Sequence, residues 1–351
     1  MKLKREKLAK RERKSYDISQ SALYNTSTKS KLASLFSIDI KALRECIGDY
    51  RQFDLIPEPD PFKSGKPPKT RKVQKPAPRL LAVHERILKL LRCVRVPEYM
   101  QFALKGTSYK KNAEAHLRKN NIATLDIRNF FGSTSKSKVF NFFKDSLKAP
   151  GDVANFYADL VTFDNCLATG SPLSPLISFY ANKNLFDELY NLAKSHDLTF
   201  TCYVDDLTFS GDKISNGFLW QVEKTIAAYG HSIACGKTKL FRNGRPAHIT
   251  GVVVHGGAIR VPNARYRKIR LIKEAIASGK EKHGLSIKEL EYKLGGLLGE
   301  AAYLDPNHLP AAIEFNKSLQ RTSLALLQHK FDCPEVNTEK LLDGASDLPW
   351  E

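Results

Sequence analysis

Two adjacent aspartates interrupt a stretch whose other residues favour β-strands. Residues 201–210 read TCYVDDLTFS, in which β-branched, aromatic and aliphatic residues flank Asp205 and Asp206. Because a carboxylate buried inside a sheet is costly, the pair is expected at the turn of a hairpin. Adjacent carboxylates at a turn repel each other unless a cation lies between them, and oxygen-only sites of high charge suit Mg²⁺.

A third carboxylate that could join this pair ends an apolar stretch earlier in the chain. Asp126 lies in ATLDIRNFF, which reads as a strand running into a turn. Three carboxylates brought together could hold two divalent ions about 4 Å apart, the arrangement that supports in-line phosphoryl transfer. An Asp-Asp pair alone is common in solvated turns, so the interpretation depends on its neighbours.

The hydrophobic pattern predicts strands and helices in a mixed order around these aspartates. The proline-rich, basic segment 57–79 cannot form a regular helix. Helices are predicted over 83–94, 139–148, 174–196 and 218–230, strands within 121–131 and 198–212, and a hairpin over 247–262. This order fits an α+β layer with helices on one face of an antiparallel sheet, flanked on each side by a basic helical segment.

The charge balance predicts a polyanionic partner. Lys and Arg number 56 against 37 acidic residues, which gives a formal net charge of +19. Such an imbalance is typical of nucleic-acid-binding proteins. No apolar run approaches the ~20 residues that span a bilayer, and the basic start (residues 1–14) lacks a signal peptide's apolar core. Six scattered cysteines suit a reducing compartment. We therefore expect a cytoplasmic protein without a membrane partner.

Three motifs in order resemble the palm of reverse transcriptases. YVDD (203–206) and LDIRNFF (125–131) flank TGSPLSP (169–175), where that family carries a QGxPxSP-type motif. KNAEAHL (111–117) looks like the NAxxH signature of bacterial retron enzymes, and HITGVVV (248–254) is close to their VTG signature. The resemblance covers roughly residues 60–310. It implies a right-hand α+β polymerase fold with fingers, a ferredoxin-like palm and a helical thumb.

The resemblance also implies a division of the chain. Its segments would be a basic N-terminal helical extension (1–55), fingers (56–120), palm with inserted fingers helices (121–260), helical thumb (261–325) and C-terminal tail (326–351).

Roles for individual residues follow from the resemblance alone. Two Mg²⁺ ions would be held by Asp126, Asp205 and Asp206 with the backbone carbonyl of Ile127. Phe131 would be the steric gate that favours dNTPs, and Lys237 the general acid for pyrophosphate, with Lys239 as the alternate. The nucleotide pocket would comprise Arg71 with Lys69 or Lys66, and Thr169, Gly170 and Pro172. RNA recognition would involve Asn112, His116, Thr250, Gly251, Arg265, Arg267 and Lys268.

Three positions depart from the family pattern. Thr169 stands where the motif usually has Gln, which removes an amide that could contact the nucleotide or template. Val204 replaces the Ala of many retron enzymes, and Ile249 replaces Val. No metal ligand is missing, so an active enzyme is expected.

The implied function is that of a retron reverse transcriptase. Such an enzyme copies its cognate noncoding RNA (msr-msd) from a guanosine 2′-OH and yields branched msDNA, commonly in antiphage defence beside a separate effector protein. Two alternatives stay open. The chain could be another bacterial reverse transcriptase, of the group II intron, diversity-generating or abortive-infection type, or a catalytically idle RNA-binding scaffold.

Overall fold

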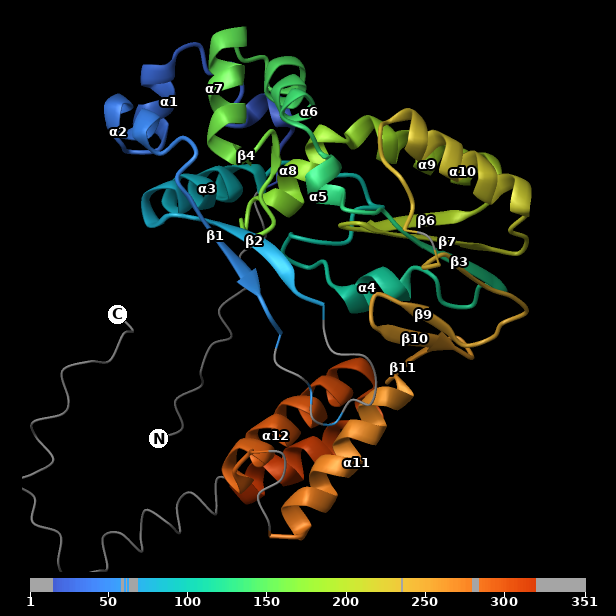
Figure 1. The fold of residues 1–351 in the computed structure, drawn as a ribbon. Coiled ribbons are helices and arrows are strands. Elements are labelled where there is room, and N and C mark those ends of the chain that lie inside the picture. The colour runs from blue at the N-terminus through green and yellow to red at the C-terminus, as the bar shows by residue number, and fades with distance from the viewer. Residues whose placement is uncertain are drawn as a thin grey trace, which may run out of the picture. The chain divides into compact units, whose positions relative to one another are not determined.

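The computed structural model describes residues 15–57, 60, 62, 69–234, 236–279 and 284–319 (Figure 1). The chain forms two compact units, which divide between Pro262 and Asn263. The basic arm 1–14, Lys66 and the tail 326–351 lie outside the described residues. Mixed helix and sheet content, expected from the sequence, is confirmed.

A four-stranded antiparallel sheet is the centre of the first unit. Its order is β6–β7–β3–β8, with β3 Asn121–Asp126, β6 Thr199–Tyr203, β7 Asp206–Gly211 and β8 Lys239–Phe241. Side chains alternate between the two faces of a strand. One face therefore carries Leu125, Leu207 and Phe209, and the other carries Asp126 and Asp206. The strand-like sequence accommodates aspartates because they lie on the polar face, at the end of the sheet.

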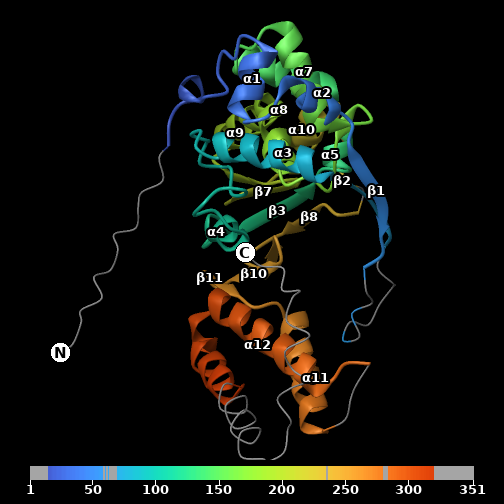
Figure 2. The same ribbon diagram turned by 90° about the vertical axis from the view of Figure 1, so that its left-hand side faces the viewer.

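Helices cover the apolar face, and α4 lies on the opposite side of the sheet (Figures 1 and 2). Phe209 of β7 packs edge-on against Phe218 of α10 at a centroid distance of 5.2 Å. The helices of this unit are η1 (Ile18–Gln20), α1 (Lys29–Leu35), α2 (Ile40–Glu45), α3 (Pro78–Leu91), α4 (Tyr109–Glu114), α5 (Phe130–Ser133), α6 (Lys136–Asn141), the π-helical η2 (Phe142–Ser146), α7 (Gly151–Val161), α8 (Ser174–Ala181), α9 (Lys183–Ser195) and α10 (Asn216–Ala228).

Three smaller sheets complete the unit. A two-stranded ribbon pairs β1 (Tyr50–Leu55) with β2 (Arg71–Pro76). A short hairpin pairs β4 (Thr162–Phe163) with β5 (Cys166–Leu167). The third sheet has the order β11–β10–β9, with β9 Ala247–Ile249, β10 Val252–His255 and β11 Ala258–Arg260.

The second unit is helical. It contains α11 (Asn263–Ala277), α12 (Ile287–Leu304), η3 (Pro306–His308) and a helix over 309–319. A capping box in which Ser286 and Glu289 exchange hydrogen bonds defines the start of α12. Within the described part of the chain, no helix is long and apolar enough to cross a membrane.

Four predicted element boundaries were wrong. The helix expected over 83–94 begins at Pro78, because proline is tolerated in the first helical turn, where its missing N–H has no partner to lose. The helix expected over 139–148 is α6 followed by a π-turn. The helix expected over 174–196 breaks at Asn182, whose side-chain amide donates a hydrogen bond to Thr134 Oγ1. The N-terminal extension ends in strand β1.

A buried histidine joins the two strands of the aspartate hairpin. His116 follows α4 and is fully buried, with Nε2 2.7 Å from Thr201 Oγ1 on β6 and Nδ1 2.7 Å from Ser210 Oγ on β7. Burial, with a smaller contribution from the charge of Lys119, lowers the pKa of His116 to about 3. The ring is therefore neutral and offers one donor and one acceptor to two hydroxyl groups.

This burial predicts an acid-sensitive contribution to stability. Because the folded pKa is depressed, the contribution of His116 is complete above pH 6.5 and is lost as the pH falls toward 3. Between pH 7 and pH 5 the free energy of unfolding of the wild type should fall by about 2 kcal/mol more than that of His116→Gln, which keeps one donor and one acceptor. Urea titrations at both pH values measure the difference. Equal losses in the two proteins would contradict it.

Candidate active site

The two aspartates of YVDD lie at a tight turn. Tyr203 pairs with Asp206, so Val204 and Asp205 form a two-residue connection between β6 and β7. Val204 has φ +61°, a left-handed conformation that is strained for a β-branched residue. Such strain persists only where the surrounding structure enforces it, and it is concentrated at functional sites.

Strand register brings the third carboxylate to the same place. Asp126 at the end of β3 is the direct cross-strand partner of Asp206. The N–H of Ile127 donates to the carbonyl of Asp205 at 3.0 Å, which fixes the turn against β3. The structure therefore brings together Asp126, Asp205 and Asp206, with Ile127 beside them, as the sequence predicted.

Burial, with nearby negative charge, raises the pKa values of Asp205 and Asp206. Burial, together with the charges of Asp205 and Asp126, raises the pKa of Asp206 to about 6. Burial likewise raises the pKa of Asp205, and Asp126 contributes, while Lys237 and Arg71 lower it. Two of the carboxylates are thus destabilised in their charged form, as expected of a site that awaits a cation.

Lys237 supplies a positive charge to this site. Its Nζ lies 2.7 Å from Asp126 Oδ2, and this hydrogen bond raises the pKa of Lys237. A cavity of about 260 Å³ contains these groups; its walls are Thr124, Leu125, Asp126, Asp206, Gly236, Lys237, Lys239 and His248. Sequence reasoning missed His248, because a lone histidine on a short strand gives no signal of the cavity that it lines.

The carboxylate oxygens of the three aspartates are of the type that binds a hard divalent cation. Among the described residues, no group of three or more His, Cys, Asp or Glu side chains converges closely enough to hold a metal ion. Asp126, however, already binds a cation in the form of the Lys237 ammonium group, and its neighbours have raised pKa values. Carboxylate oxygens are the ligands that Mg²⁺ prefers, so these side chains match such an ion in their chemistry but not in their spacing in this structure.

The predicted nucleotide-pocket residues gather around β2. Arg71 begins this strand, is exposed, and acts on the pKa of Asp205 through its charge. Thr169 donates from N and from Oγ1 to Gln74 Oε1, at 3.3 and 3.1 Å, and Gly170 donates to the carbonyl of Gln74 at 3.1 Å. Lys69 is exposed just before the strand. The loop of the central motif therefore docks on the strand that carries Arg71.

Two further predicted residues lie near this loop or on α5. Pro172 is exposed and lines a groove of about 860 Å³ that also contains Lys89, Arg92 and Lys105. Phe131 is half-buried, and its ring centroid lies 6.2 Å from that of Phe130.

The residues assigned to RNA recognition have different environments. Asn112 and His116 are fully buried, so neither side chain is available for direct contact with RNA in this structure. Asn112 Nδ2 donates to Thr250 Oγ1 at 3.3 Å, and the buried Asn112 Oδ1 has no hydrogen-bond partner among the described residues. Thr250 and Gly251, with φ of +43° and +87°, form the tight turn between β9 and β10.

The remaining three residues lie on α11, in the second unit. Arg265 forms an ion pair with Glu300 of α12. Arg267 is exposed, and Lys268 is half-buried.

Comparison of the sequence with those of known proteins finds several relatives with similar names. No family model matches it. The Retron Se72 reverse transcriptase of Salmonella heidelberg is 31% identical over 235 residues, which cover 64% of this chain and 59% of that protein. The chain is a relative of the retron reverse transcriptases. The Retron Mx162 reverse transcriptase of Myxococcus xanthus is 27% identical over 255 residues, 64% of this chain and 52% of that protein.

The length of the match differs among the retron relatives. The chain spans less than two thirds of the two proteins above. The Retron Ec83 reverse transcriptase of Escherichia coli is 24% identical over 320 residues, which cover 84% of this chain and 95% of that protein. A solved foamy viral protease-reverse transcriptase in complex with double-stranded DNA aligns with 88% of this chain and 48% of its own, at 15% identity and a TM-score of 0.44. That score is too low to carry an argument.

The close contact of Gly170 with β2 leads to a prediction. A Cβ at this position would lie 2.6 Å from the carbonyl oxygen of Gln74 and 2.8 Å from Val73 Cγ1, so the backbone must shift. We expect Gly170→Ala to lower the free energy of unfolding by about 1–3 kcal/mol. Gly151→Ala, where a Cβ meets nothing within 4 Å, is the matched control and should not destabilise the protein. Equal midpoints of urea unfolding for the two variants would contradict the prediction.

Proposed function

We propose that the chain is a retron reverse transcriptase, an RNA-directed DNA polymerase that copies a cognate noncoding RNA. One observation carries the proposal. Asp126, Asp205 and Asp206 gather at the end of one sheet and face a lysine, in a relative of retron reverse transcriptases. An idle scaffold has no reason to keep three mutually repelling carboxylates together beside a strained turn.

The residues at this site have different roles in the proposed reaction. The three aspartates and the Ile127 carbonyl would hold two Mg²⁺ ions, which when bound activate the attacking hydroxyl and neutralise the leaving pyrophosphate. Lys237 keeps its proton because its pKa is raised, and it is 61% exposed. It can therefore donate to the leaving pyrophosphate once its contact with Asp126 opens.

Substrate selection falls to residues around β2 and α5. Arg71 and Lys69 are exposed cations that can bind the triphosphate of a dNTP, while Thr169, Gly170 and Pro172 line the path of nucleotide and template. Phe131 acts as the steric gate that rejects a ribose 2′-OH. These assignments correspond to a right-hand polymerase with fingers (56–120), palm (121–260) and thumb (261–325).

The net charge of +19 supports an RNA partner, since neutralised phosphates supply most of the affinity for nucleic acid. Synthesis begins at a guanosine 2′-OH and gives branched msDNA, in the bacterial cytoplasm and beside a separate effector protein. Arg265, Arg267 and Lys268 bind RNA from the second unit. Asn112 and His116 act indirectly, since they are buried and hold the β9–β10 turn and the aspartate hairpin.

Analysis of the nucleic acid that copurifies with the protein tests this function. The protein is expressed with its flanking locus, alongside Asp205→Asn with Asp206→Asn. We expect a short DNA that is linked 2′–5′ to RNA in the wild type and is missing from the double variant. Copurified RNA without DNA would favour the idle scaffold, and DNA without a 2′–5′ branch would favour another type of reverse transcriptase.

The role of Lys237 can be separated from general electrostatics. Lys239 lines the same cavity and therefore provides a matched control. Lys237→Met should lower kcat for dNTP incorporation by about 10²-fold with little change in KM, the usual loss on removing a general acid. Lys239→Met should change kcat only a few-fold. Single-nucleotide incorporation assays measure both, and a larger loss in Lys239→Met would reverse the assignment.

A further inference from the structure

A half-buried lysine is connected by hydrogen bonds to the segment that carries Phe131. Lys138 of α6 places Nζ 3.0 Å from Asn182 Oδ1, 2.6 Å from the carbonyl of Tyr229 and 2.6 Å from His231 Nε2. An ammonium group has three donors, and here each donor has an acceptor. Burial lowers the pKa of Lys138 to about 8, so the charge is held at a cost.

One arm of hydrogen bonds runs from Lys138 through His231. We assign Nε2 as the acceptor from the ammonium group, so that Nδ1 carries the proton and donates to Ser133 Oγ at 2.7 Å. Ser133 Oγ then donates to the carbonyl of Phe130 at 3.2 Å. Burial, with a smaller contribution from the charge of Lys138, lowers the pKa of His231 to about 4, which keeps the ring neutral.

A second arm runs from Lys138 through Asn182 to the same carbonyl. Asn182 Nδ2 donates to Thr134 Oγ1 at 3.0 Å, and Thr134 Oγ1 donates to the carbonyl of Phe130 at 2.9 Å. Asn182 is 2% exposed and Thr134 is fully buried. Two arms from one lysine, which also touch each other where His231 Nε2 lies 2.7 Å from Asn182 Oδ1, therefore end on the carbonyl of Phe130, the residue before Phe131.

The segment needs such anchoring because its own helix is short. Helix α5 spans only Phe130–Ser133 and begins after Asn129, which has φ +48°. So short a helix has little stability of its own. A buried charge is also weak support for stability, since apolar side chains of similar volume often serve as well. A role in positioning accounts for the lysine better than a role in stability.

We propose that Lys138, Asn182 and His231 are positioning residues that hold Phe131 in place and thereby set the choice between deoxyribose and ribose. The inference rests on the proposed polymerase function. A gate that excludes one hydroxyl group acts only if its ring cannot retreat by the width of that group. Both arms resist this retreat by fixing the carbonyl of Phe130.

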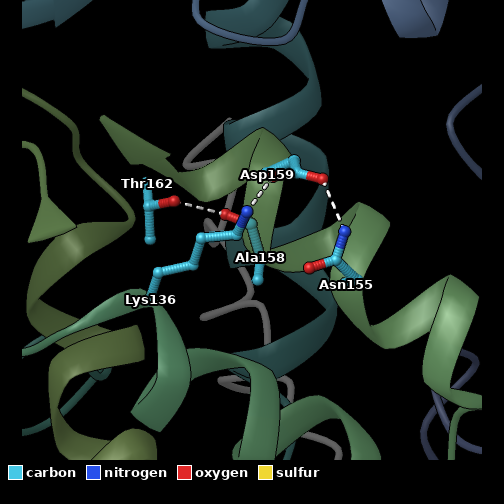
Figure 3. A network of polar contacts seen from close by, with 5 residues as sticks. All are labelled: Lys136, Asn155, Ala158, Asp159 and Thr162. Carbon is cyan, nitrogen blue, oxygen red and sulfur yellow. Dashed lines mark hydrogen bonds and ion pairs between the residues drawn. The ribbon is translucent and has the colours of Figure 1, made fainter. Parts of the chain in front are cut away.

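Helix α6 also provides a control. Lys136, two residues before Lys138, forms an ion pair with Asp159 of α7 (Figure 3). Asp159 also accepts from Asn155 Nδ2 at 2.9 Å, and Thr162 Oγ1 donates to the carbonyl of Ala158 at 2.6 Å. Lys136→Met therefore removes a lysine contact between α6 and α7 and leaves both arms intact.

The test compares incorporation of a dNTP with that of the matching rNTP on an RNA template, as a ratio of kcat/KM values. Phe131→Val should lower this ratio and so establish the gate. Lys138→Met should lower it by about tenfold, and Lys136→Met should keep the wild-type ratio. Because Lys138→Met leaves buried acceptors without a donor, a milder variant is included. Ser133→Ala with Thr134→Val keeps Lys138 and removes the two hydroxyl groups through which His231 and Asn182 reach the carbonyl of Phe130, and it should also lower the ratio.

The outcomes separate this inference from the function on which it rests. A wild type that copies RNA, with an unchanged ratio in the folded double variant, overturns the inference alone. An unchanged ratio in Phe131→Val overturns it as well, because there is then no gate to position. A wild type that copies no template overturns the proposed function and the inference together.

Discussion

Mutual repulsion among three carboxylates is the constraint around which the first unit is arranged. Pairing of β3 with β7 places Asp126 opposite Asp206, and the strained Val204 turn adds Asp205. Repulsion alone would separate these groups. The sheet register, the hydrogen bond from Ile127 and the nearby charge of Lys237 oppose that separation. The electrostatic energy stored in this arrangement makes the site receptive to cations, as the proposed phosphoryl-transfer function requires.

Neutral histidines recur as the means of holding this arrangement. His84 joins α3 to Ser171 of the central motif, with Nδ1 2.7 Å from its Oγ. His116 joins β6 to β7, and His231 joins Lys138 to α5. Burial lowers the pKa of all three. A neutral imidazole presents one donor and one acceptor in a rigid plane, so it can connect two elements without adding charge beside the carboxylates.

Much of the site was readable from sequence, because its parts are local. Strand propensity around Asp205 and Asp206 and the apolar run before Asp126 predicted a hairpin and its neighbour, and both exist. Long-range contacts were not readable. The break at Asn182 follows from hydrogen bonds to Thr134, and no periodicity in 174–196 reveals it. The burial of Asn112 and His116 likewise depends on packing between segments distant in sequence.

The hydrogen bond between Asn112 and Thr250 joins residues 138 positions apart. All four strands of the central sheet lie between these two residues in the sequence, yet the residues meet where α4 contacts the β9–β10 turn. The stretches 111–117 and 248–254, which look like separate motifs in the sequence, are therefore joined in one structural unit. If only one of the two stretches were exchanged with that of a relative, one partner of this hydrogen bond would come from each protein. We therefore expect the two stretches to be compatible only when they are changed together, in evolution as in protein engineering.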